Sequence, residues 1–144
     1  MYGSGTHNLP IYASKGNDIK FNLWLFDSND YDRENGGYDY VHQDQIDWYV
    51  KTSEELEKKA GHPVPSIAFQ HIIVPEIYDL LTEVPASEKK AEGVVKGFSS
   101  HSGHYYKMGD GFTAGHLGEA PCPPDIPSGE FAAMRDTGDG RRRK

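Results

Sequence analysis

Histidine and aspartate are the residues of this chain whose surroundings suggest chemistry. His71 lies near the end of an apolar stretch, residues 66–74, which prolines 65 and 75 enclose in the manner of a buried strand. Side chains at the carboxyl ends of strands contact ligands in open α/β sheets. An imidazole in that place can be a metal ligand, and the alternative is a core histidine with its hydrogen bonds satisfied. On the residues alone, the core histidine is favoured.

Asp27 follows a second apolar stretch, residues 19–26, and begins a polar segment. If both stretches are strands of one sheet, the loops after Asp27 and after His71 open on the same side and form a crevice. Asp27 is then a candidate site residue, and the alternative is an aspartate that starts a turn.

The remaining candidate groups give weaker signals. His101 and His104 are three residues apart, a spacing that lets two imidazoles share an ion on a helix, but the surrounding serines and glycines favour a solvated loop. His116 has no partner at a ligand-like spacing, and Cys122 lies between prolines without an activating motif. The carboxylates of residues 27–47 are numerous, as is common in an acidic protein, and they indicate acid–base catalysis only weakly.

Composition limits the classes of function. The 144 residues have a net charge of −7 despite a basic tail, residues 140–144, so we expect neither nucleic acid nor an anionic membrane as a partner. A phosphate-bearing substrate would need a local positive charge, such as a metal ion. The single cysteine excludes a disulfide within the chain and a thiolate metal site. With neither a signal peptide nor a membrane span in the sequence, the expected location is the cytoplasm.

The hydrophobic pattern predicts an α/β chain of one domain that has to position these groups. A right-handed βαβ crossover with parallel strands is expected, because a helix separates the second and third strands. Asp44 is expected to cap that helix and Gly61 to end it. In the next, short helix we expect Ile77, Leu80 and Leu81 to face inward. The predicted elements are strands at 9–13, 19–26 and 66–74, helices at 43–60, 75–81 and 129–135, and a long irregular loop region at 82–128.

Three segments together resemble a calcineurin-like metallophosphoesterase of the purple acid phosphatase-like branch. Leu-Trp-Leu-Phe-Asp-Ser at 23–28 resembles a family strand that ends in Leu-Asp-Ser. Gly-Tyr-Asp-Tyr-Val-His-Gln-Asp-Gln-Ile-Asp-Trp-Tyr at 37–49 is similar to its tyrosine-rich loop and the helix that begins Gln-x-x-Trp. Pro-Ser-Ile-Ala-Phe-Gln-His at 65–71 resembles its strand with a lone metal-ligand histidine. The Glu-Ala-Pro-Cys segment and residues 129–134 match less distinctly.

The resemblance implies an enzyme that hydrolyses phosphate mono- or diesters. Two metal ions, of Fe, Mn or Zn, would activate a bridging water at the carboxyl ends of the strands of a sandwich. The resemblance also reverses the preference for a core histidine and implies that His71 is a metal ligand. It also places the substrate near Asp27 and the loop that holds His101, His104 and His116.

The chain also departs from the family pattern. The opening motifs Asp-x-His, Gly-Asp and Gly-Asn-His, which supply most ligands, would precede Met1, and the closing Gly-His-x-His is missing. Ile73 stands where a proline often follows the histidine. We therefore expect residues 1–139 to be a partial phosphoesterase domain, inactive alone and able to self-associate through exposed sheet edges. The alternative is a degenerate, non-catalytic binding module whose aromatic loops, 31–49 and 105–106, hold a partner.

Overall fold

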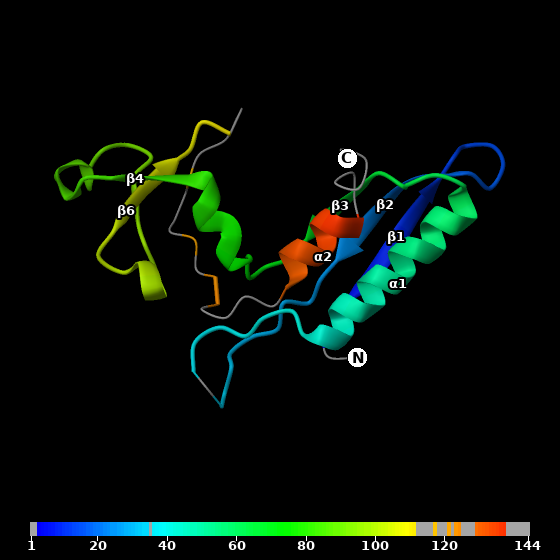
Figure 1. Ribbon diagram of the computed structural model, residues 1–144, viewed down its shortest axis with the longest axis horizontal. Coiled ribbons are helices and arrows are strands. Elements are labelled where there is room, and N and C mark those ends of the chain that lie inside the picture. Colours follow the sequence, from blue (N-terminus) through cyan, green and yellow to red (C-terminus); the bar gives the residue numbers. More distant parts are fainter. Residues whose placement is uncertain are drawn as a thin grey trace.

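Two small sheets organise the chain (Figure 1). The computed structural model describes residues 3–34, 36–111, 117, 121, 123–124 and 129–137. The first sheet has the strand order β1-β2-β3 and the second has the order β4-β6-β5. The elements are β1 (His7–Tyr12), β2 (Ile19–Leu25), α1 (Gln43–Ala60), β3 (Ser66–Phe69), η1 (Pro75–Leu80), β4 (Leu81–Val84), η2 (Ala86–Glu88), β5 (Val95–Lys96), η3 (Ser99–His101), β6 (Tyr105–Met108) and α2 (Glu130–Thr137). The predicted mixed α/β class is confirmed.

The first sheet contains the predicted βαβ unit. β2 and β3 pair in parallel, in register from Asn22 opposite Ser66 to Leu25 opposite Phe69, and α1 connects them. β1 pairs with β2 antiparallel through a turn in which the Ala13 amide donates to the Asp18 carbonyl over 2.8 Å. Antiparallel neighbours need only such a short turn, whereas parallel neighbours need a crossover.

Helix α1 begins and ends as its sequence dictates, with one correction. Its bounds are those predicted, and Gly61 ends it with φ of 76°, a left-handed conformation that glycine adopts without steric cost. The predicted cap, Asp44, is wrong. His42 is the N-cap residue, and the side chain of Gln45 accepts a hydrogen bond from the His42 amide over 2.8 Å. Asp44 lies in the first turn, where its charge still complements the helix dipole.

One cluster of buried side chains joins α1 to the sheet. We call it the Trp24 cluster. The indole of Trp24 meets Tyr49 and Trp48 edge to face, at centroid distances of 4.6 and 5.7 Å. Ala133 and Met134 of α2 pack against the same cluster, so α1 and α2 cover one face of the sheet (Figure 1). The cluster consists of Trp24, Phe26, Val41, Ile46 and Tyr49.

The opposite face of this sheet is apolar and open. Directly paired residues share a face, so Leu9 lies beside Leu23, which in turn lies beside Ile67, and Leu25 lies beside Phe69. Ile67 is 46% exposed and Phe69 is 52% exposed. Within the described residues no helix covers this side. Parallel strands normally have both faces buried, so this sheet has the surface of a layer that packs against another layer.

The strand that carries the candidate histidine is shorter and more exposed than predicted. β3 spans only Ser66–Phe69, and all four of its residues are exposed. The prediction of a buried strand over residues 66–74 was wrong for two reasons. β3 is an edge strand with one open face, and residues 70–74 leave the sheet before η1 begins.

The second sheet occupies part of the region predicted to be irregular. β6 pairs antiparallel with both β4 and β5, and its Tyr106 is buried. The predicted short helix is a 3-10 helix, η1, which buries Tyr78 and leaves Leu80 exposed, so the expected inward position of Leu80 was wrong. Strands of two to four residues are too short for alternation to identify them.

The boundaries of the partial domain at 1–139 and of the basic tail at 140–144 stay predictions, since residues 138–144 lie outside the described part. Among the described helices, none combines the length and the apolarity that crossing a membrane requires.

Candidate functional site

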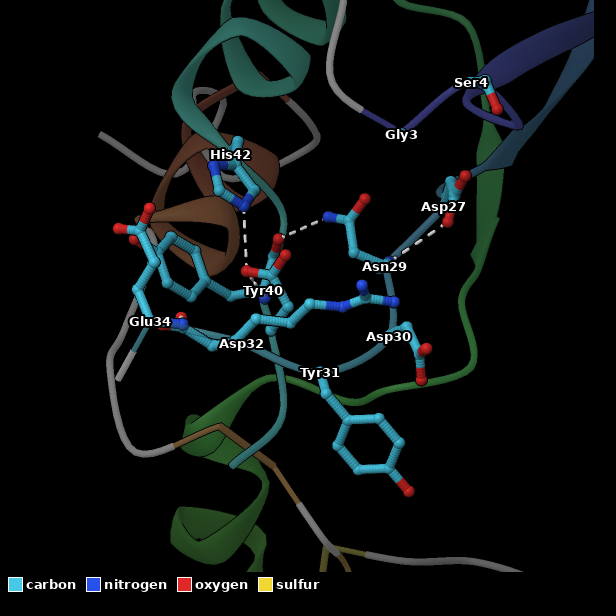
Figure 2. Close-up of a pocket in the computed structure, with 12 residues that line it drawn as sticks. Gly3, Ser4, Asp27, Asn29, Asp30, Tyr31, Asp32, Glu34, Tyr40 and His42 are labelled. Atoms are coloured by element: carbon cyan, nitrogen blue, oxygen red, sulfur yellow. Dashed lines mark hydrogen bonds and ion pairs between the residues drawn. The ribbon is translucent and has the colours of Figure 1, made fainter. Parts of the chain in front are cut away.

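A cleft of about 790 Å³ opens beside the amino end of α1, bordered by the loop that follows β2 (Figure 2). The side chain of Gln45, which is 0% exposed, holds together the segments that form the walls of the cleft. Its Nε2 donates to the Thr6 hydroxyl over 2.7 Å and to the Asp27 carbonyl over 2.8 Å. Its Oε1 accepts from the His42 amide and from Asn29 Nδ2. One buried amide therefore joins the segment before β1, the turn after β2 and the start of α1.

Gly3 permits this arrangement. It has φ of 67°, and a Cβ at this position would overlap the amide of Gln45. Only glycine provides both this backbone conformation and this close approach.

Asp27 lines the cleft, and its carboxylate holds a turn. Oδ1 accepts from the Asn29 amide over 3.1 Å, and Oδ2 accepts from the Gly5 amide over 3.1 Å. This is the geometry of an aspartate that begins a turn. A part for Asp27 in substrate binding stays a prediction.

A buried aspartate supports the other wall. Asp39 Oδ1 lies 2.9 Å from Nε2 of His42 and accepts from the Tyr40 amide over 2.9 Å. The His42 ring stacks on Tyr40 at a centroid distance of 4.8 Å. Asn29 Nδ2 donates to the Tyr40 carbonyl over 2.7 Å, which links the two walls (Figure 2).

Electrostatically the cleft is acidic. Arg33 is among the described residues that line it, and Tyr31 lies at the rim (Figure 2). Such a field repels a phosphate ester unless a cation intervenes. The lining carboxylates are Asp27, Asp30, Asp32, Glu34 and Asp39.

His71 lies at the same edge of the sheet as Asp27 but not among the residues that line the cleft. Both residues follow the last paired residues, Leu25 and Phe69, by two positions. His71 is exposed, so the alternative of a core histidine was wrong. The loops after β2 and β3 are joined where the Ile72 amide donates to Ser28 Oγ over 2.8 Å. The predicted convergence of the two loops is therefore confirmed, whereas the cleft forms between the Asp27 loop and α1.

We expect Ser28→Ala to lower the free energy of unfolding by about 2 kcal/mol, because it leaves the buried Ile72 amide without its acceptor. Urea denaturation measures the loss, and faster hydrogen exchange of the Ile72 amide locates it. Ser66→Ala, at an exposed position of β3, is the matched control and should change stability by less than about 0.5 kcal/mol. Equal effects of the two substitutions would contradict the link between the loops.

His101 and His104, the described histidines of the long loop, lie in and just after η3, before β6, and each has a separate partner. His101 stacks on Tyr78 at a centroid distance of 3.8 Å, and its Nδ1 lies 2.9 Å from the Tyr106 hydroxyl. His104 Nδ1 lies 2.6 Å from Glu83 Oε1. Neither residue lines the cleft, and their parts in substrate binding stay predictions. His116 and Cys122 lie outside the described residues.

Metal ligands do not assemble within the described part of the chain, where no three His, Cys, Asp or Glu side chains gather as a metal site requires. His71 offers one imidazole at the sheet edge. These residues alone therefore do not fit a dinuclear centre, which would need ligands from elsewhere.

Sequence reasoning overlooked the two residues that position the cleft. Both occur in the sequence analysis only as members of the segment at 37–49. A sequence signal existed, since His42 and Gln45 have the spacing of a capping box, but the pattern usually has serine or threonine first. The cleft itself joins segments distant in the sequence.

Comparison with protein families, curated proteins and solved structures finds no match to this chain.

Proposed function

We propose that this chain is the carboxyl-side part of a metal-dependent phosphoesterase, which hydrolyses phosphate mono- or diesters with a metal-activated water. His71 would be a ligand of one ion. The observation that carries the proposal is the parallel pairing of β2 and β3, which brings Asp27 and His71 to the same edge at equal distances past the paired residues. Such edges hold ligand-binding residues in open α/β sheets.

The exposure of His71 supports this assignment. A histidine that follows an edge strand and is open to solvent is accessible to a cation, whereas a core histidine is not. One imidazole does not hold a metal pair, so the remaining ligands would come from outside the described residues. A pair of Fe, Mn or Zn ions would suit nitrogen and oxygen donors.

The open apolar face supports the view that the fold is partial. Leu9, Ile67 and Phe69 are exposed on a face that a second layer of a sandwich would bury. Without that layer, this surface and the outer edge of β3 give the chain a means of self-association.

The test has two parts, the sequence of the flanking DNA and the phosphatase activity of the extended protein. We expect the DNA that flanks this coding region to encode Gly-Asn-His upstream and Gly-His-x-His downstream. The correspondingly extended protein should contain two metal ions and release phosphate from an aryl phosphate. His71→Ala should lower that activity by at least about a hundredfold, because changes even in partners outside a metal's ligands cost up to that factor.

The matched control is His62→Ala, which removes an exposed imidazole away from the sheet edge. It should leave the activity unchanged. Full activity in His71→Ala would contradict the assignment of the ligand. Turnover by the present chain alone, lost in His71→Ala, would contradict the view that it is only a part.

A second candidate is a non-catalytic binding module on the same scaffold. The rings of Tyr31 and Tyr38 stack at a centroid distance of 5.4 Å, and Tyr38 lies 6.2 Å from the exposed Phe98. This aromatic row beside the cleft offers a surface for a partner. Tyr49 and Tyr106, by contrast, are buried and not available to one. A well-folded monomer that contains no metal by elemental analysis would favour this candidate.

A further inference from the structure

A carboxyl group is buried where α2 meets the connection between β3 and η1. Glu130 is the first residue of α2, and it is 3% exposed. Glutamate is almost never fully buried unless it has a partner. This residue lies outside the cleft and takes no part in the function proposed above.

Two side chains from residues 70–76 change the pKa of this carboxyl. Gln70 hydrogen-bonds to it and also donates from Nε2 to the Ile72 carbonyl over 2.9 Å. Glu76 of η1 is the described residue whose charge acts on it, and the two negative charges repel. The carboxyl therefore lies between α2 and the connection that leads away from β3.

Farther along α2, two apolar side chains contact the core. Ala133 and Met134 pack against the Trp24 cluster, and both are only partly buried. The helix has eight residues, too few to be stable without packing. The buried carboxyl of Glu130 is a further point at which α2 meets the rest of the fold.

We propose that Glu130 is a proton-dependent latch. When protonated, its carboxyl stays buried where α2 meets residues 70–76 and α2 remains docked; when ionised, the carboxylate moves into solvent and α2 leaves the Trp24 cluster. The inference is independent of the proposed phosphoesterase activity.

The direction of the pH dependence follows from the site. Burial raises the pKa of Glu130 from 4.5 to about 7; the hydrogen bond from Gln70 lowers it, and the charge of Glu76 raises it further. Between these two values the docked state binds more protons than the open state. Docking is therefore fully stabilised below pH 4.5, weakens as pH rises, and levels off above pH 7. Within the window, the opening equilibrium of α2 rises by up to about tenfold per pH unit.

Hydrogen exchange followed by mass spectrometry on the whole chain tests this at several pH values between 5 and 8.5. After correction for the intrinsic exchange rate, the opening equilibrium constant of α2 should rise by about tenfold between pH 5.5 and 6.5. It should stop rising above about pH 7.5. Amides of α1 serve as the internal reference for global stability. The fluorescence of Trp24 and Trp48 should change over the same range. Trp24 belongs to the cluster against which α2 packs, and Trp48 packs against the same cluster.

Glu130→Gln keeps the shape of the side chain without its charge, so opening of α2 should lose its pH dependence. Glu88→Gln, an exposed site on η2, is the matched control and should keep the wild-type profile. A wild-type α2 whose exchange does not change with pH, or a Glu130→Gln variant that keeps the wild-type rise, would overturn the proposal. If Glu130→Gln does not fold, a ¹³C NMR titration of the wild-type Glu130 carboxyl decides: a midpoint near 7 supports the latch, and one below 5.5 overturns it.

Discussion

Gln45→Ala is expected to lower the free energy of unfolding by about 3 kcal/mol. The substitution removes at once the hydrogen bonds of Gln45 to the Asp27 carbonyl, the His42 amide and the Thr6 hydroxyl, the last of which keeps its bond from the Asp27 amide. Each buried polar group left without a partner costs roughly 1–3 kcal/mol, and water from the adjacent cleft should offset part of the total. The three segments that Gln45 joins should also separate, so the cleft should lose its shape.

The chain supplies a matched control two residues away. Gln43 is on the exposed side of α1, where its Nε2 donates to Asp47 over 2.8 Å. Gln43→Ala should change stability by less than about 0.5 kcal/mol, because water replaces an exposed hydrogen bond at little cost. Urea denaturation of both variants, followed by circular dichroism, measures the difference. If the two glutamines have similar effects, Gln45 does not have the organising role assigned to it.

Trp24→Ala should have the largest effect of any single substitution considered, a loss of about 4 kcal/mol. Trp24 is 3% exposed and meets both Tyr49 and Trp48 edge to face, so its removal leaves a large cavity between the sheet and α1. Native domains are stable by only about 5–15 kcal/mol, so this variant should be close to unfolding at room temperature. Trp24→Phe, which retains part of the contact, should fall between it and the wild type.

The open face of the same sheet supplies the control for Trp24→Ala. Phe69→Ala also removes an aromatic ring, but that ring is half exposed and should cost about 1 kcal/mol or less. Guanidinium chloride denaturation, at protein concentrations low enough to keep the chain monomeric, separates the two values. A cost for Phe69→Ala that approaches the cost for Trp24→Ala would mean that the open face is covered in solution.

The two faces also bear on what the chain does. One face packs on the Trp24 cluster, which includes Phe26 just before Asp27, and the other has exposed apolar residues that another layer would bury. His71 follows β3, the edge strand of this sheet. If the chain is part of a phosphoesterase, the metal centre would lie at this edge, and the extended protein is the sample that tests it.

Local signals were sufficient for the elements around α1. Its apolar spacing and the glycine at position 61 predicted the same bounds that the structure has, and a strand on each side implied the parallel pairing of β2 and β3. These predictions succeed because helix periodicity and chain stops act over a few residues. The cap was misassigned because His42, with Gln45, takes a position more often held by serine or threonine.

Predictions failed where the outcome depends on distant partners. The strands of the second sheet have four residues or fewer, and their pairing is visible only when β4 and β6 lie side by side. Residues 66–69 have the composition of a buried strand, yet they are exposed because nothing described pairs with the outer edge of β3 or covers its open face. Composition specifies what a strand can bury, and only the neighbours decide whether it is buried.

By itself, then, the sequence determined the βαβ unit, the limits of α1 and the placement of Asp27 directly after a strand and of His71 near the end of the neighbouring one. Those features follow from hydrophobic period and from stop residues close along the chain. Only the tertiary structure decided that Gln45 shapes a cleft, that His71 is open to solvent and that Glu130 is buried beside Gln70. Each of these depends on contacts between side chains that are tens of residues apart in the sequence. Burial and hydrogen bonding arise from such contacts and cannot be derived from any one segment.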